Sequence, residues 1–191
     1  MLLKGRCRNC KTKLSIQYPF IEALNGVLYL VIFLIIGFNY LAVIYCLLAS
    51  ALLTLSVIDL KTYEIPFGIN VFILALGLVR LAFEWPNYLP YVIGFFAVSV
   101  FLEIILLLSK GRAIGGGDVK LMAVCGLLIG YKLAILAFIL ACILGSIIHL
   151  LRMKFTDAEN VLAMGPYLSL GVFISILFGN EMINWYIGLI W

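Results

Sequence analysis

Charged residues are scarce in this sequence: Asp, Glu, Lys and Arg make up 12% of its 191 residues, whereas 65% are hydrophobic. A soluble domain has about one quarter charged residues and about one half apolar ones, so the composition excludes an ordinary soluble domain. Internal repeats and low-complexity linkers are also missing. The net charge of +4 does not indicate a nucleic-acid partner. The first nineteen residues are basic and lack the apolar core of a cleavable signal peptide.

Long apolar runs dominate the rest of the chain. Several reach the roughly 20 residues that a helix needs to cross about 30 Å of hydrocarbon. We expect an all-α, polytopic membrane helix bundle over residues 20–191, preceded by a basic cytoplasmic segment over residues 1–19. The predicted membrane helices, about seven in number, cover residues 20–36, 40–58, 67–83, 89–108, 119–129, 133–151 and 161–178. The tail over residues 179–191 is expected to lie in the membrane interface or to extend the last helix.

The basic residues predict the orientation of the bundle. Lys and Arg accumulate in cytoplasmic loops of membrane proteins. With the N-terminus in the cytoplasm, only Arg80 and Lys132 of the 13 Lys and Arg residues fall near the opposite face. We therefore expect a multi-pass protein of the inner or plasma membrane. Because the predicted helices alternate in direction, Asp59 and Asp118 then share the cytoplasmic side.

These two aspartates are the strongest candidates for chemistry. Asp59 closes the second predicted helix and Asp118 opens the fifth, and an acid at the end of a membrane helix is costly. Two carboxyl groups about 3 Å apart cannot both ionise, so they share one proton. One group can then activate a water while the other protonates a peptide carbonyl. The alternative is that Asp118 only caps a helix and Asp59 is solvated by water.

Three glycines, Gly115, Gly116 and Gly117, precede Asp118. Glycine can adopt backbone angles that are closed to other residues, and it would let a substrate strand approach the backbone closely. Asp118 follows at the predicted start of a helix, where unpaired amides favour a negative charge. The segment therefore predicts an active-site loop.

The pairing of Asp59 with a G-x-G-D segment resembles the GxGD membrane aspartic proteases, and in particular the bacterial prepilin peptidases, or type IV leader peptidases. Four segments resemble that family in its order and span almost the whole chain. They are GRCRNC from residue 5 with YPFIEAL from residue 18, IDLKTYEIP from residue 58, IGGGDVKL from residue 114 and MGPY from residue 164. The presenilin type is disfavoured, because those proteases have Tyr before the first aspartate and Ile58 stands here.

The resemblance implies an aspartic endopeptidase that removes the basic leader of type IV prepilins or pseudopilins at the cytoplasmic membrane face, just before the substrate's apolar helix. Asp59 and Asp118 would be catalytic, and proteolysis would need no cofactor. The partners would be the prepilin substrate and the lipid bilayer; the sequence does not predict an oligomeric state. A non-enzymatic alternative is a membrane carrier or assembly factor that binds a cation or proton with the paired carboxylates.

Cys7 and Cys10 form a C-x-x-C pair, which is half of a structural zinc site. The other ligands would come from a second copy or another protein, and the single His149 is more simply structural. Long family members also carry an earlier C-x-x-C and N-methylate the new N-terminus, so S-adenosylmethionine would be a cofactor only if this chain keeps that activity. The remaining cysteines are expected to pack as small hydrophobes: Cys46, Cys125 and Cys142.

Other charged residues near the aspartates allow two interpretations. Lys61, Arg112 and Lys120 could shift the pKa of the pair or simply anchor the cytoplasmic side, and Glu64 is expected to be solvated. Glu103 lies within a predicted membrane helix, where an unpaired charge is costly. It could be protonated, pair with a basic neighbour or line the substrate groove.

Overall fold

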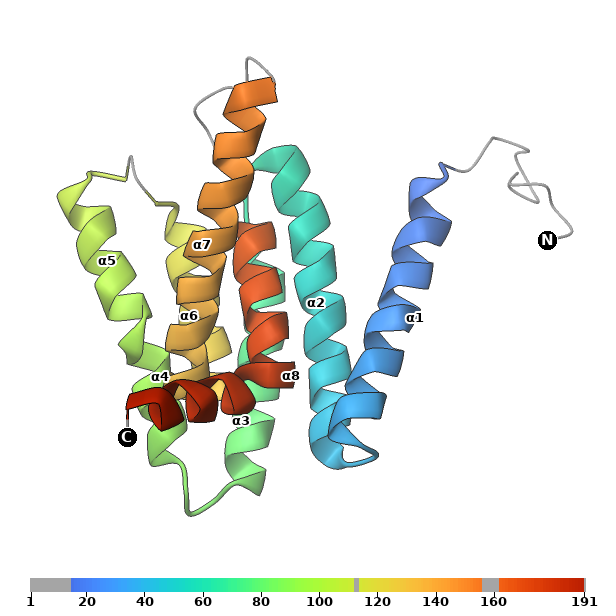
Figure 1. The fold of residues 1–191 in the computed structure, drawn as a ribbon, viewed down its shortest axis with the longest axis vertical. Coiled ribbons are helices and arrows are strands. Elements are labelled where there is room, and N and C mark those ends of the chain that lie inside the picture. The colour runs from blue at the N-terminus through green and yellow to red at the C-terminus, as the bar shows by residue number, and fades with distance from the viewer. Residues whose placement is uncertain (1–14, 112–113, 156–161, 191) are drawn as a thin grey trace, which may run out of the picture.

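The computed structural model describes residues 15–111, 114–155 and 162–190, and every regular element in these ranges is an α-helix (Figure 1). The predicted all-α bundle is therefore confirmed. The helices of the described ranges are α1 Gln17–Ile36, α2 Tyr40–Thr62, α3 Phe67–Phe83, α4 Leu89–Ala97, α5 Ser99–Leu108, α6 Gly116–Ile129, α7 Tyr131–Phe155 and α8 Gly165–Ile190.

Five helical segments of the described ranges are long and apolar enough to cross a membrane: α1, α2, α4 with α5, α7 and α8. Helix α3 is a shorter apolar helix of 17 residues. Helix α6 has 14 residues and is buried along almost its whole length. The predicted polytopic membrane protein is thus confirmed, with α6 as an internal helix shielded by its neighbours.

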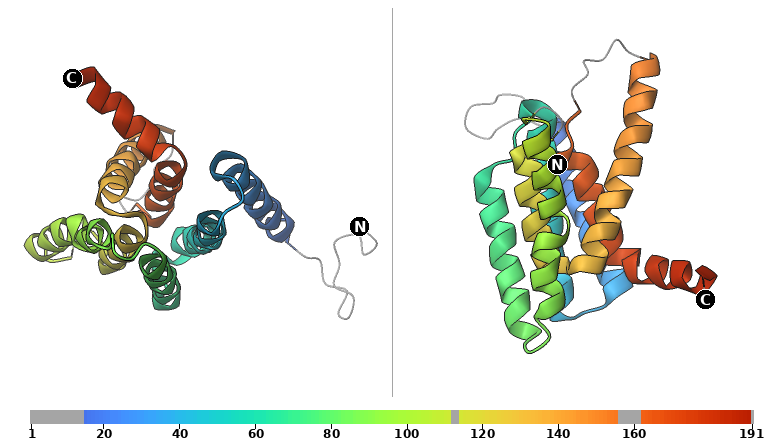
Figure 2. Two further views of the ribbon diagram at one scale, coloured as in Figure 1. Left: turned by 90° about the horizontal axis from the view of Figure 1, so that it is seen from below. Right: turned by 90° about the vertical axis from the view of Figure 1, so that its left-hand side faces the viewer.

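Helix α6 forms the centre of the bundle. It contacts α3, α4, α5, α7 and α8, whereas α1 lies at the edge and contacts α2 and α8 (Figure 2). Gly94 of α4 and Gly126 of α6 let these two helices cross at backbone distance, because a Cβ atom on either residue would collide with the carbonyl of the other. Small residues permit such close helix packing in lipid, where no hydrophobic force draws helices together.

Arg80 of α3 is buried and joins four helices at the end of the bundle away from the aspartates. Its guanidinium donates hydrogen bonds to the Tyr45 hydroxyl of α2 at 2.7 Å, the Leu128 carbonyl of α6 at 2.8 Å and the Tyr91 hydroxyl of α4 at 3.2 Å. These acceptors offset the cost of burying the charge. Arg80 is therefore a structural residue.

Several boundaries differ from the prediction. Helix α2 continues to Thr62, so Asp59 lies in its last turn rather than beyond it. The predicted helix over residues 89–108 is divided at Val98. Helix α1 begins at Gln17, just before the predicted boundary at residue 20, and residues 1–14 lie outside the described part. The division into a basic segment and a membrane domain therefore stays a prediction.

The C-terminal tail follows one of the two predicted alternatives, and its position in the membrane interface stays a prediction. Helix α8 is continuous from Gly165 to Ile190 and thus extends the last span. Figures 1 and 2 show that it bends, and that its last turns run crosswise to the long axis and project from the bundle. Trp185 and Tyr186 on these turns are 70% and 62% exposed, and such residues are common at membrane interfaces.

Candidate active site

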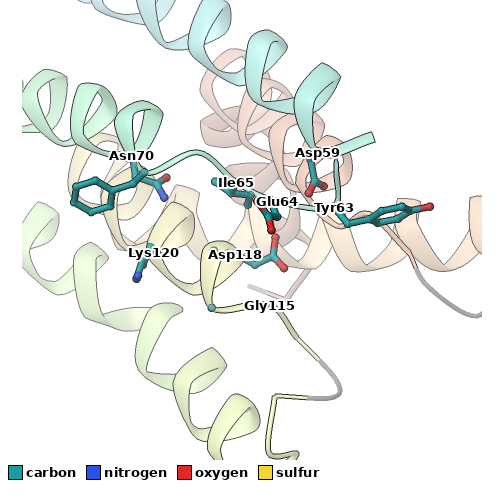
Figure 3. Close-up of a pocket in the computed structure, with 11 residues that line it drawn as sticks. Asp59, Tyr63, Glu64, Ile65, Asn70, Gly115, Asp118 and Lys120 are labelled. Atoms are coloured by element: carbon teal, nitrogen blue, oxygen red, sulfur yellow. The ribbon is translucent and has the colours of Figure 1, made fainter. Parts of the chain in front are cut away.

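Asp59 and Asp118 lie in one cavity at the end of the bundle. Asp59 comes from the last turn of α2 and Asp118 from the first turn of α6, and the cavity that they line has a volume of about 320 Å³. Their side chains are 4% and 9% exposed. Figure 3 shows the two carboxyl groups on facing walls, pointing toward one another. The fold thus unites two aspartates that stand 59 positions apart in the sequence.

The turn after α2 brings the first aspartate into place. Tyr63 ends the helix in the left-handed region, with φ of 55°, and its amide donates to the Asp59 carbonyl at 2.9 Å. The chain then passes through Ile65 to α3. A Cβ atom on Gly117 would lie 3.0 Å from the Cβ of Ile65. The loop of the first aspartate therefore packs directly on the glycine beside the second.

The glycines serve a different purpose from the predicted one. Gly115 is the N-cap of α6 with φ of −76° and ψ of 142°, angles open to any residue, and Gly116 and Gly117 lie in the helix itself. The expectation of unusual backbone angles is therefore wrong. At Gly115 the missing side chain instead leaves room for Asp118, because a Cβ atom there would lie 3.2 Å from Oδ2 of Asp118. Close approach of a substrate strand stays a prediction.

Gly165 contacts the first aspartate directly. It is the first residue of α8, and its amide donates a hydrogen bond to Oδ2 of Asp59 at 2.9 Å. A Cβ atom there would lie 2.7 Å from the same oxygen, so any other residue would force the Asp59 carboxyl group to move. The MGPY segment entered the sequence argument only through its resemblance. Pro166, at a position typical of helix starts, was the one local signal that a helix begins here.

The two carboxyl groups affect each other electrostatically. Asp118 lies outside the candidate membrane spans. Its pKa is raised from 3.8 to about 6, chiefly by burial and further by the negative charge of Asp59, while the Gly115 amide lowers it. The expectation that amides at the helix start favour a negative charge holds for the Gly115 amide, but burial outweighs this effect. Asp118 can keep a proton close to neutral pH.

Comparison with known proteins places the chain in a family. The profile of the Type IV leader peptidase family matches residues 46–150, more than half of the chain, and that of the Bacterial Peptidase A24 N-terminal domain matches residues 1–36. The chain belongs to the type IV leader peptidase family. The family predicted from the four segments is thus confirmed, and with it a peptidase, whereas the carrier alternative gains no support.

Curated relatives in this family carry the name prepilin leader peptidase/N-methyltransferase. The protein from Legionella pneumophila is 30% identical over 98% of this chain and 68% of its own length. That from Pseudomonas putida is 30% identical over 95% of this chain and 66% of its own length. That from Bacillus subtilis (strain 168) is 27% identical over 96% and 75%. The chain thus spans about two thirds of the length of these leader peptidases. No solved structure matches it significantly.

Some predicted neighbours of the aspartates line the cavity and others do not. Glu64 and Lys120 are exposed side chains in its wall. Lys61 instead donates to the Gln17 side chain of α1 at 3.2 Å. Glu103 is exposed on α5 and is absent from the cavity wall. Arg112 lies outside the described residues.

The predicted zinc ligands cannot be placed, because Cys7 and Cys10 lie outside the described residues. Within residues 15–111, 114–155 and 162–190, no group of three or more His, Cys, Asp or Glu side chains is arranged to hold a metal. Zinc binding and the use of S-adenosylmethionine therefore stay predictions. Cys46 and Cys125 are buried and Cys142 is half-buried, as expected of packing residues.

Asn70 of α3 is a cavity residue that the sequence argument missed. It is 5% exposed and lines the cavity together with the aspartates. Its side-chain Oδ1 is buried and has no hydrogen-bond partner among the described residues. The available signal was a single amide four residues after Pro66 in an otherwise apolar run.

Proposed function

We propose that this chain is a membrane aspartic endopeptidase that cleaves the basic leader from type IV prepilins or pseudopilins, with Asp59 and Asp118 as its catalytic pair. The observation that carries the proposal is that these two aspartates, from different helices, are buried and line one cavity. Membership of the leader peptidase family and the names of the relatives support the substrate class.

The reaction follows from the unequal environments of the two groups. Asp118, with a pKa of about 6, holds the shared proton at the start of the cycle and donates it to the oxygen of the scissile carbonyl. Ionised Asp59, oriented by the Gly165 amide, takes a proton from the attacking water. A tetrahedral intermediate forms and collapses when the leaving nitrogen receives the proton taken up by Asp59. The pair titrates as one unit. On collapse, a hydroxyl of the tetrahedral intermediate returns a proton to Asp118, which restores the starting state.

The cavity wall also suits a peptide chain. Gly115 and Gly116 are exposed there, so a substrate strand meets backbone rather than side chains. We place this end of the bundle in the cytoplasm, because Lys61, Lys110 and Lys120 lie there while Lys132 lies at the other end (Figure 1). The basic leader of a prepilin would reach the aspartates from that side.

The test is the cleavage of a co-expressed prepilin by Asp59→Asn and Asp118→Asn variants. Each change keeps the size of the side chain and removes its acid–base chemistry, so we expect a loss of cleavage of about 10²–10⁴-fold, the contribution of general acid–base catalysis. Glu103→Gln is the matched control, because it neutralises an exposed acid outside the cavity. Normal cleavage by either aspartate variant would refute the catalytic pair.

Methylation of the product is a separate question. The relatives' names include an N-methyltransferase activity, and we expect it here only if the Cys7–Cys10 region supports it. Mass spectrometry of the cleaved prepilin separates the two activities, because a methylated N-terminus is heavier than an unmodified one. Replacement of Cys7 and Cys10 by serine should leave proteolysis unchanged if their role is confined to methylation.

A further inference from the structure

A second hollow adjoins the aspartate cavity. It has a volume of about 190 Å³ and lies between α3, α4 and α6, where its wall includes Val71, Leu74 and Val124. Phe67, Asn70 and Lys120 line both spaces. Figure 3 shows Asn70 and Lys120 on one side of the site and Asp59 on the other, with Asp118 between them. Asn70 therefore stands where a polar cavity meets an apolar one.

The unpaired oxygen of Asn70 is unusual for a buried group. A buried polar atom without a partner costs free energy, so almost all such atoms are hydrogen-bonded. Arg80, the other buried polar residue of α3, makes three hydrogen bonds. Of that guanidinium only Nε lacks a partner, whereas Oδ1 of Asn70 makes no hydrogen bond within the described residues, although a leucine there would suit the apolar helix. An unpaired acceptor that costs free energy in the unbound protein indicates that a ligand supplies its hydrogen-bond donor.

A peptide bound for cleavage supplies such a donor. Its backbone must be extended at the scissile bond, so its N–H groups are unpaired there, and they need acceptors once water is excluded. The basic leader cannot enter the apolar hollow without a large desolvation cost. The apolar segment that follows the scissile bond can enter it. The substrate peptide would thus pass Asn70 as it runs from the aspartate cavity into the apolar hollow.

Building on the function proposed above, we infer that Asn70 is a substrate-positioning residue. Its Oδ1 accepts a hydrogen bond from one backbone N–H on the C-terminal side of the scissile bond. The apolar hollow between α3, α4 and α6 receives the first apolar side chains after that bond. The contact recognises backbone rather than a side chain, so it fixes the register of the peptide on the aspartates independently of sequence.

The test combines a change in the enzyme with a change in the substrate. Synthetic prepilin peptides, each with one backbone amide after the scissile bond replaced by an ester, lack a single N–H donor. With the unmodified enzyme we expect one ester position to lower kcat/KM about tenfold, the size of one hydrogen bond. Asn70→Leu should lower kcat/KM of the all-amide peptide to a similar extent, and the same ester should then have no further effect.

Other outcomes decide against the inference. If no ester lowers cleavage by the unmodified enzyme, or if esters act equally on the unmodified enzyme and Asn70→Leu, Asn70 does not contact the substrate backbone. Asn70→Asp, which keeps an acceptor oxygen, should retain the sensitivity to the ester and serves if Asn70→Leu fails to fold. The proposed function is judged separately, because its failure would show as no cleavage of the all-amide peptide by the unmodified enzyme.

Discussion

At the scale of single residues, the two aspartates of the site have identical side chains in different surroundings. Burial and the charge of Asp59 keep a proton on Asp118, while the Gly165 amide holds Asp59 by hydrogen bonding. In the proposed reaction, Asp118 is thus the proton donor and Asp59 the proton acceptor before substrate arrives, as acid–base catalysis requires. The packing that achieves this involves glycines whose missing side chains leave room for the carboxyl oxygens.

The pKa of Asp118 predicts how cleavage depends on pH. Because this pKa is raised to about 6, Asp118 keeps its proton as the pH rises to that value and loses it above. We therefore expect kcat/KM to fall about tenfold per pH unit well above the pKa, as for one essential acid of the free enzyme. Initial rates of prepilin cleavage in liposomes would measure this. A rate that does not change between neutral and alkaline pH would contradict it.

Gly165→Ala should uncouple Asp59 from its backbone donor. The new methyl group would lie 2.7 Å from Oδ2 of Asp59, so the carboxyl group must move, and a shift of about 1 Å can cost about a hundredfold in rate. We expect a loss of kcat of roughly that size, measured by single-turnover cleavage. Gly188→Ala in the same helix is the control, because no atom lies within 4 Å of its Cβ position.

At the scale of helices, the position of Asp118 depends on how α6 is held. Helix α6 is too short to be one of the candidate spans and is enclosed by its neighbours, so its first turn is fixed by packing on several sides. At the crossing of Gly94 and Gly126, the two helices touch through backbone atoms, and a Cβ atom on either glycine would collide with the other helix. Separation of α4 from α6 would displace the apolar hollow as well as the helix that carries Asp118.

Gly126→Ala should therefore destabilise the bundle. Its Cβ atom would collide with the Gly94 carbonyl, which is backbone and cannot rotate away. Overpacking of this kind costs about 1–3 kcal/mol. We expect a lower temperature of irreversible aggregation in detergent, followed by size-exclusion chromatography of heated samples. Gly26→Ala on α1, with no atom within 4 Å of the Cβ position, should behave as the unmodified protein does.

At the scale of the whole molecule, the sequence predicted more of the architecture than of the site. Apolar runs placed α3 at its observed bounds, residues 67–83, because lipid demands uninterrupted apolar helices. The break at Val98 escaped detection, since both sides of it are equally apolar. Asn70 was not predicted, and Gly165 entered only through the resemblance of the MGPY segment. The role of an unpaired oxygen or of a missing Cβ atom can be recognised only when the fold brings distant segments together.

The predicted orientation can be tested on intact cells. We expect a cysteine that replaces Lys132 to react with a membrane-impermeant thiol reagent from outside. A cysteine that replaces Lys61, which is also exposed but at the other end, should react only after the membrane is permeabilised. The unmodified chain provides the background from its native cysteines. The reverse pattern would place the aspartates outside the cytoplasm and remove the basis for cleavage there.

The bend in α8 has a consequence for where cleavage occurs. Its last turns run crosswise to the long axis of the bundle, near the end away from the aspartates (Figure 1). Trp185 and Tyr186 on these turns are exposed. A crosswise aromatic segment fixes one side of a protein at the lipid headgroups, so the depth of the aspartate cavity is then set by the thickness of the bilayer. Liposomes with longer acyl chains should draw the cavity deeper and slow cleavage. Removal of both aromatic rings should weaken that dependence, as cleavage rates across a series of acyl lengths would show.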